Sequence, residues 1–487
     1  MTDPNTCDLL IQRALLFDGA GTPPVTGDLA VRNDKIAVIG DLRNWHARET
    51  IDAQGLALAP GFIDVHTHDD RALLIGDMAN KTSQGVTSVV VGNCGVSLAP
   101  LTLRDAPPPP LDLIGAQSDF RYPTFADYMA ALDRQPPAIN AACLVGHSTL
   151  RVGAMDRLDR PAEAGEIAAM RARLQEALDA GAIGLSTGLD YQPAAAAPTE
   201  EVQALAALLK PAGAIHTTHM RSEGDRVIEA MDEAFAIGQS ADVPVVISHF
   251  KVHGKTNFGR SAETLAKFDA RRLRQPLALD AYPYSASSTV LESQRIDEAP
   301  KVMVTWSTAH PEMTGRMLDD VAAEWGCSQE DAAKKLQPAG AVYFAMEEAD
   351  VQRILRYPHT MIGSDGLPHD AHPHPRLWGS FPRVLGHYAR ELGLFPMEEA
   401  VRRMTTLPAE RFGLTGRGRL KQNYAADLVL FDPRTVKDRA TFEHPKQTSA
   451  GIVAVWVNGR TVWRDGAATG VRPGRALRRQ QLQLAFE

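Results

Sequence analysis

The amino-acid sequence predicts an α/β fold: a (β/α)8 TIM barrel with a small β-sandwich formed from both termini and an inserted lid subdomain. Three observations support this prediction. Short apolar runs alternate with helical patterns through the centre of the chain of 487 residues. Both ends of the chain are patterned as strands and turns. A segment of roughly 75 residues separates the last two apolar runs, far more than one crossover helix needs.

The two ends of the chain are expected to build one small β domain, comprising residues 1–60 and 415–487. Strand-like runs separated by turn residues occur near both termini, and Asn458-Gly459 is a favourable hairpin turn. Such a domain would hold the ends of the central unit together. The runs are residues 9–17, 28–31, 35–39, 427–431, 451–457 and 460–463.

The central part, residues 61–284 and 357–414, is expected to form the catalytic barrel. Strands that alternate with helices imply a parallel sheet, and eight such strands close a (β/α)8 barrel. An open doubly wound sheet is the alternative, but no G-x-G-x-x-G follows the first strand. The strand signals are residues 61–65, 86–92, 140–146, 182–186, 214–218, 243–248, 277–281 and 360–364. Helical patterns between them include residues 163–180, 200–209, 225–237 and 262–273.

Residues 285–356 are expected to form the inserted lid subdomain. A barrel carries its active site where its strands end, so an insertion between the seventh and eighth strands is placed to cover that site. Its helical signals are residues 298–304, 313–324, 328–335 and 346–353.

Composition excludes several classes of protein. The chain has 51 Lys and Arg against 59 Asp and Glu, a formal net charge of -8, which gives no reason to expect a nucleic acid or a membrane surface as partner. Four scattered cysteines do not make a disulfide framework. No signal peptide is visible at the N-terminus and no run approaches the roughly 18 apolar residues of a spanning helix, so a cytoplasmic location is expected. No pattern indicates the oligomeric state.

Residues able to bind a metal or transfer a proton stand at the ends of the predicted strands. In Gly61-Phe-Ile-Asp-Val-His66-Thr-His68 the two imidazoles are two residues apart and therefore face the same way. Because the strand ends of a closed barrel form a ring, residues distant in sequence are expected to meet there. These residues are His66, His68, Cys94, His219, His249 and Asp365.

A thiolate together with imidazoles favours Zn2+ over Mg2+ or Ca2+, which prefer oxygen ligands. Asp365 suits general acid–base work, because a carboxylate beside a metal-bound water can take its proton and later deliver it to a leaving amine. His66 and His68 would complete a second metal site or shape the first, and the residues are compatible with one metal or two.

These motifs resemble the metal-dependent amidohydrolase superfamily and, more narrowly, its D-aminoacylase (N-acyl-D-amino-acid deacylase) family. The Cys94 motif is the specific one, because many relatives use a carboxylated lysine as bridging ligand and this branch uses cysteine. The resemblance covers almost the whole chain. The motifs are His66-Thr-His68, Gly-Asn-Cys94-Gly, His219-Met-Arg, His249-Phe-Lys, Ser-Asp365-Gly, Gly184-Leu-Ser-Thr-Gly-Leu-Asp-Tyr191, Asp280-Ala-Tyr-Pro-Tyr284, His374-Pro-Arg-Leu-Trp-Gly-Ser-Phe381 and Ala425-Ala-Asp-Leu-Val-Leu-Phe-Asp432.

The resemblance implies zinc-dependent hydrolysis of linear N-acyl-D-amino acids, with Asp365 as catalytic acid–base. It implies a tightly held zinc and a weaker second site, and Tyr282 as a substrate contact. The preference for D-configured substrates comes wholly from the resemblance. The implied ligands are Cys94, His219 and His249 for the tight site and His66, His68 and Asp365 for the weaker one.

Three cations are candidates for binding an anionic substrate. Lys251 follows His249 by two residues, and Arg376 lies in the segment after Asp365, where a guanidinium suits a carboxylate. Arg295, near the start of the lid, could meet an acidic substrate side chain, which favours N-acyl-D-glutamate over N-acyl-D-aspartate or apolar substrates. The alternative is that Lys251 and Arg376 are ordinary surface cations and that Arg295 pairs with Glu292 or Asp297.

Two rival functions share this predicted fold. A cyclic-amide hydrolase of the dihydropyrimidinase type would place a lysine at the fourth strand end, where this chain has Gly184-Leu-Ser-Thr-Gly188. A catalytically inactive scaffold of the same fold would not need an intact set of Cys94, His219, His249 and Asp365.

Overall fold

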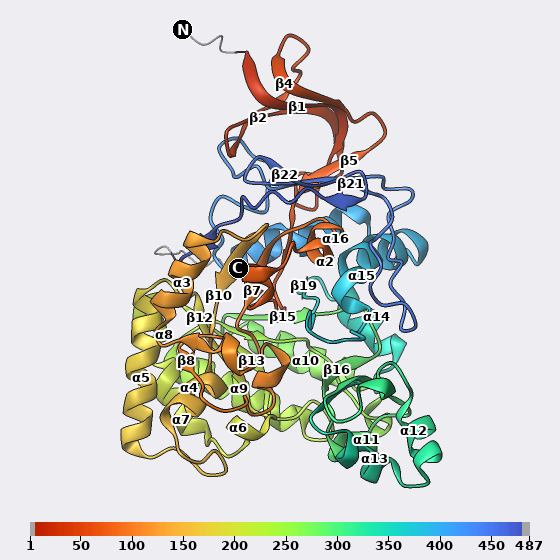
Figure 1. The fold of residues 1–487 in the computed structure, drawn as a ribbon. Helices are drawn as coiled ribbons and strands as arrows, with labels where there is room; N and C mark the ends of the chain where they lie inside the picture. The colour runs from red at the N-terminus through yellow and green to blue at the C-terminus, as the bar shows by residue number, and fades with distance from the viewer. Residues whose placement is uncertain (1–4, 480–487) are drawn as a thin grey trace.

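The computed structural model describes residues 5–479, and it contains the predicted barrel (Figure 1). Every neighbouring pair of barrel strands is parallel. A parallel bridge between Thr67 and Gly366 joins the first strand to the last and closes the ring. The strands are β6 (Phe62–Asp64), β7 (Val86–Val91), β10 (Asn140–Cys143), β11 (Val145–Gly146), β12 (Gly184–Gly188), β13 (Ile215–His219), β14 (Val245–Ile247), β15 (Leu277–Ala281) and β19 (Thr360–Ile362).

Each predicted barrel strand overlaps an observed one, because these apolar runs are buried on both faces, as parallel strands under helices must be. β10 and β11 together form the third barrel strand, interrupted at Leu144. The barrel interior is filled by side chains such as Ile63, Val90 and Val246. Helices on the outside include α3 (Phe125–Arg134), α4 (His147–Ala154), α5 (Ala164–Asp179), α7 (Thr199–Ala206), α9 (Val227–Ala241), α10 (Ser261–Arg272) and α16 (Met397–Met404).

Strands from the two chain ends form one nine-stranded sheet, in which β5 pairs antiparallel with β20. The sheet surrounds a core to which both ends contribute, including Ile11, Leu29 and Trp456. Asn458 and Gly459 have φ of 47° and 76°, as a two-residue hairpin turn requires. The strands are β1 (Thr6–Leu16), β2 (Val25–Arg32), β3 (Lys35–Gly40), β4 (His46–Asp52), β5 (Ala57–Pro60), β20 (Leu428–Phe431), β21 (Ile452–Val457), β22 (Arg460–Arg464) and β23 (Ala467–Ala468).

The C-terminal segment also reaches the barrel, which the sequence did not predict. The short strand β24 (Ala476–Leu477) leaves the terminal sheet and pairs in parallel with β10. Residues 1–4 and 480–487 of the predicted terminal domain lie outside the described residues.

The insertion contains a three-stranded antiparallel sheet in the order β16-β18-β17, with its own apolar core around Leu318, Ala332 and Ala341. In Figure 1 it lies beside the barrel, drawn in green to teal. Its elements are β16 (Ser287–Val290), α11 (Ser293–Ile296), β17 (Val302–Ser307), α12 (Leu318–Trp325), α13 (Gln329–Leu336) and β18 (Ala339–Tyr343).

Two predicted features of the insertion differ from the structure. Residues 298–304 are expected to be helical, but β17 already begins at Val302. Its β-branched residues favour a strand, and its backbone groups pair with the distant β18. α14 (Glu348–Arg356) falls inside the predicted range 285–356, yet it packs against α10 and β19. Its apolar stripe of Val351, Ile354 and Leu355 belongs to the core of the barrel.

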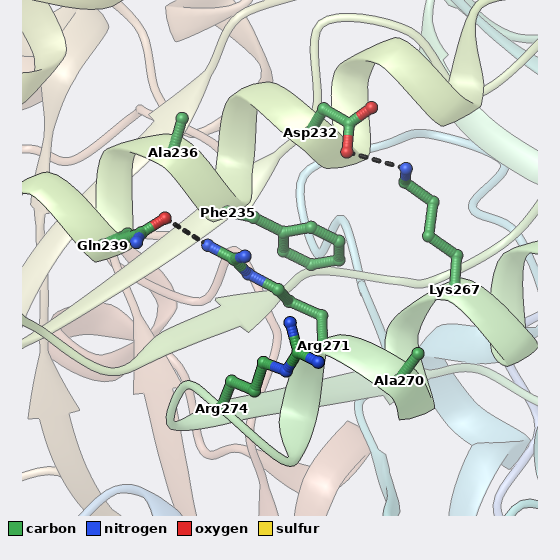
Figure 2. A pocket seen from close by; sticks show the side chains of 8 residues that line it. All are labelled: Asp232, Phe235, Ala236, Gln239, Lys267, Ala270, Arg271 and Arg274. Carbon is green, nitrogen blue, oxygen red and sulfur yellow. Dashed lines mark hydrogen bonds and ion pairs between the residues drawn. The ribbon is translucent and has the colours of Figure 1, made fainter.

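A groove of about 480 Å3 runs along the outer wall between α9 and α10 (Figure 2). It is lined by side chains of those two helices and of Arg274 just after α10, and an ion pair of 2.7 Å between Lys267 and Asp232 spans it. None of the predicted site residues lines it. Within residues 5–479, no helix is long and apolar enough to cross a membrane.

Candidate metal centre

The structure brings all six predicted metal and acid–base residues together at the carboxyl ends of the barrel strands. All six are buried. They form two potential metal-binding groups that share Cys94, and the ligand atoms of each group lie within 4.8 Å of one another. The first group is His66, His68, Cys94 and Asp365, and the second is Cys94, His219 and His249.

Cys94 lies at the centre of this cluster. Its Sγ is 3.2 Å from Nε2 of His66 and 3.3 Å from Nε2 of His249. Burial alone would raise the pKa of Cys94, but the charges of His66 and His249 lower it well below its usual value. A lowered pKa favours the thiolate, the form that binds a metal.

The backbone is strained at three of these residues. Cys94, His249 and Asp365 have φ of 52°, 36° and 49°, in the left-handed region that non-glycine residues rarely adopt. Each such residue costs on the order of 1–3 kcal/mol, and strain of this kind is typical of functional sites. This backbone strain occurs at the ends of three different strands, which supports a functional site at these residues.

The donor set fits a zinc ion. His219 is almost completely buried, yet neither ring nitrogen has a hydrogen-bond partner among the described residues. A buried imidazole whose nitrogens make no hydrogen bond is costly unless a ligand satisfies them. A thiolate with imidazoles is the ligand set that Zn2+ prefers, whereas Mg2+ and Ca2+ prefer oxygen.

Glu223 is a site residue that the sequence reasoning missed. Its carboxylate lies 2.9 Å from Nδ1 of His249 and 2.7 Å from Nζ of Lys251. A carboxylate beside the far nitrogen of a ligating histidine helps to fix the orientation of the ring. The only signal in the sequence is its position four residues after His219, which is a common pattern.

Replacing Glu223 with Gln is expected to weaken zinc binding by about 10- to 100-fold, because the neutral amide no longer stabilises His249 as a ligand. Competition with a chelator measures this change. Glu201→Gln is the matched control, since Glu201 is also buried and pairs with a histidine, His147, at 2.9 Å. Equal zinc affinity in the two variants would contradict the assignment.

Lys251, Tyr282 and Arg376 also meet at the cluster. Nζ of Lys251 lies 5.8 Å from the centroid of the Tyr282 ring, and the guanidinium of Arg376 lies 4.6 Å from it. The Tyr282 hydroxyl is buried and has no hydrogen-bond partner among the described residues. Lys251 and Arg376 are themselves buried, so neither is an ordinary surface cation.

Arg376 also holds Asp365. Its Nη1 lies 2.8 Å from Oδ2 of Asp365, and its Nη2 donates to the carbonyl of Ser288 in the insertion. The other carboxylate oxygen, Oδ1, is 3.2 Å from Nε2 of His68. Burial alone would raise the pKa of Asp365, but the charges of Arg376 and His66 hold it well below its usual range.

Arg295 extends from α11 in the insertion to the edge of the same site. Its Nε lies 2.8 Å from Oε2 of Glu292, the partner anticipated from the sequence, and it also pairs with Asp190. Asp190 lies 3.7 Å from Nε2 of His219 and was not anticipated. Arg295 is therefore placed beside the metal cluster, where it pairs with two carboxylates.

An apolar wall packs against Cys94, and the sequence reasoning did not identify it. Its residues come from separate segments of the barrel and the insertion, so no local pattern marks them. They are Leu113, Tyr191, Val290 and Leu367, with Trp306 packed against them.

A model described as Amidohydrolase family matches residues 49–463. The chain is 56% identical to a D-aminoacylase of Alcaligenes xylosoxydans xylosoxydans, over 98% of this chain and 99% of the relative. An N-acyl-D-aspartate deacylase from the same organism is 52% identical, over 97% and 95% of the two chains. Its N-acyl-D-glutamate deacylase is 49% identical, over 97% and 96%.

Solved structures agree with these relatives. A D-aminoacylase with a binuclear metal centre matches with a TM-score of 0.95 and 54% identity, covering 97% of this chain and 100% of that one. An N-acyl-D-glutamate deacylase from Bordetella bronchiseptica, complexed with zinc and a phosphonate inhibitor, matches with a TM-score of 0.94, 48% identity and the same coverage. A D-hydantoinase shares only the fold, at 16% identity and a TM-score of 0.61. The chain belongs to the amidohydrolase family, in its D-aminoacylase branch.

Proposed function

We propose that this protein hydrolyses the amide bond of N-acyl-D-amino acids, giving a carboxylate and the free D-amino acid, and that N-acyl-D-glutamate is its favoured substrate. The observation that carries the proposal is the buried cluster centred on Cys94, with Asp365 and the cations Lys251 and Arg376 beside it. The names of its close relatives, all deacylases of D-configured substrates, support the reaction and the handedness.

The proposed tight zinc site consists of Cys94, His219 and His249, and a weaker second site consists of His66, His68 and Asp365. When bound, zinc would lower the pKa of a coordinated water towards about 7 and polarise the scissile carbonyl. The zinc and the binuclear centre named for the two solved relatives support the proposal that this protein binds a metal.

Asp365 is proposed as the general acid–base. The Arg376 guanidinium keeps it ionised and holds Oδ2, so Oδ1 is directed towards the histidine cluster. An ionised carboxylate in this position accepts a proton from the attacking water and then donates it to the leaving nitrogen. The leaving group departs as the neutral amine of the D-amino acid.

The α-carboxylate of the substrate is proposed to bind between Tyr282, Lys251 and Arg376. The free Tyr282 hydroxyl can donate a hydrogen bond, and burial raises the pKa of Tyr282 to about 12, so it keeps its proton. Two buried cations near this ring supply positive charge where little water competes.

The rival functions receive less support. β12 ends in Gly188 and contains no lysine that could be carboxylated, as a cyclic-amide hydrolase of this fold would require. An inactive scaffold does not need a complete set of buried metal ligands, three of which have a strained backbone, so their presence favours an enzyme.

A screen tests the proposal directly. The zinc-loaded protein is incubated with N-acetyl derivatives of Glu, Asp and Leu in both configurations, and release of the free amino acid is measured. The proposal predicts activity on the D-forms, greatest for N-acetyl-D-glutamate. Activity on cyclic amides alone, or no activity with zinc bound, would overturn the proposed reaction, and strong preference for D-Leu would overturn the glutamate assignment.

Replacing Arg295 with Ala is expected to lower kcat/KM for N-acetyl-D-glutamate by roughly 10- to 100-fold more than for N-acetyl-D-leucine, because a charge-assisted contact would be lost. Arg316→Ala is the control, since Arg316 lies in the same insertion and pairs with Glu324 at 2.6 Å. Equal losses on both substrates would rule out a role for Arg295 in side-chain recognition.

A further inference from the structure

A completely buried lysine, Lys81, lies under the metal cluster and has no part in the proposed chemistry. It extends from the short helix α2 (Ala79–Thr82). Its Nζ donates to Oδ2 of Asp64 at 2.7 Å and to the hydroxyl of Thr67 at 2.9 Å. It also donates to the hydroxyl of Ser364 at 2.8 Å and lies 3.1 Å from Oδ2 of Asp69.

These four partners belong to the two sides of one seam in the barrel. Asp64, Thr67 and Asp69 lie in or just after the first strand, whereas Ser364 follows the last. Asp64 ties the two sides directly, because its Oδ1 accepts from the backbone N–H of Ser364 at 2.8 Å. The Lys81 ammonium group therefore lies where the ring of strands closes.

The residues on either side of this seam are the proposed ligands of the second metal site. Thr67 separates His66 from His68, and Ser364 directly precedes Asp365. The backbone N–H of Asp365 donates to the carbonyl of His66 at 2.7 Å. A shift of one strand end past the other would therefore move Asp365 relative to both histidines.

We propose that Lys81 is a positioning residue that sets the distance between the His66–His68 strand end and Asp365. It thereby controls the weaker metal site and the orientation of Asp365, while the site of Cys94, His219 and His249 does not depend on it. This inference rests on the proposed function, since it takes the ligand assignments from there.

The chemistry of the cluster suits this role better than simple stabilisation. A buried ion pair contributes little net stability, because desolvation offsets most of the attraction. It does fix geometry, and here one ammonium group binds two carboxylates and two hydroxyls on both sides of the seam. Arg151 provides a contrast: it is equally buried and pairs with Glu201, yet neither residue is a partner of a proposed metal ligand across this seam.

The test compares Lys81→Met with Arg151→Met in zinc stoichiometry and in kinetics. Lys81→Met is expected to keep one tightly bound zinc and to bind zinc at the weaker site with about 10- to 100-fold lower affinity. Its kcat should fall while KM stays unchanged. In the Co2+-loaded protein, the sulfur-to-metal absorption from Cys94 should persist. Arg151→Met should lower the melting temperature without any of these changes.

Because Lys81→Met leaves two buried carboxylates and could fail to fold, Thr67→Val is the second variant. It removes one hydroxyl partner of Lys81 without changing volume, and Thr67→Ser restores that hydroxyl. Thr67→Val should reproduce the selective loss and Thr67→Ser should reverse it. Loss of both zinc sites together, or of neither, in variants that fold would overturn the role of Lys81. Wild-type protein that binds no zinc would instead overturn the proposed function.

Discussion

Replacing Asp365 with Asn is expected to lower kcat/KM for N-acyl-D-amino acids by roughly two to four orders of magnitude, the span typical of a lost general acid–base. The amide keeps the shape of the carboxylate but cannot accept a proton from water or return one to the leaving amine. Its neighbours should hold it in place, since Arg376 retains the carbonyl of Ser288 and the Tyr282 ring as partners. Steady-state kinetics on the zinc-loaded variant measure the loss.

The Asp365→Asn variant should still bind zinc and keep its fold. Its metal content and its circular dichroism spectrum are therefore measured together with the kinetics. Asp427→Asn is a suitable control, because Asp427 is also buried and ion-paired, with Arg417 in the terminal domain. It should affect stability and leave kcat/KM near wild type. If Asp365→Asn kept wild-type turnover, another group would have to be the base.

Replacing Cys94 with Ala is expected to abolish tight zinc binding and, with it, the hydrolytic activity. Cys94 is shared by both ligand groups, so its removal takes a ligand from each. The remaining imidazoles would lose the negative charge that compensates the metal. Zinc content after gel filtration measures the effect, and added zinc should not restore wild-type turnover.

Cys143→Ala is the matched control for this experiment. Cys143 is also buried, but burial raises its pKa, so it remains a thiol and packs as a small apolar residue. This variant should keep its zinc and its activity. Unchanged zinc stoichiometry in Cys94→Ala would remove the basis for the proposed metal site.

Much of the barrel could be predicted because its signals are local. A parallel strand buried on both faces is a short apolar run, and the residue that follows it lies at the mouth of the barrel. Six such residues, from His66 to Asp365, converge as the strand pattern predicted. The family assignment, based on the same motifs, is confirmed by the relatives.

What the sequence could not predict depends on contacts between distant segments. Glu223 and Asp190 are ordinary acidic residues until the fold places them beside His249 and His219. The sheet of the insertion was missed because β17 finds its partner only after two intervening helices. The pairing of Arg295 with Glu292 is the alternative that the sequence left open beside a substrate contact, whereas its pairing with Asp190 joins the insertion to the barrel and has no local signal in the sequence.

The pairing of β5 with β20 has a consequence for how this chain is made. Residues 57–60 are synthesised long before residues 428–431, so the edge of β5 that pairs with β20 stays unpaired until the whole barrel has been synthesised. Contacts between such distant segments slow folding and leave apolar strand edges exposed in the nascent protein. The barrel, whose strands follow one another along the chain, can begin to assemble earlier, and the terminal sheet is completed last.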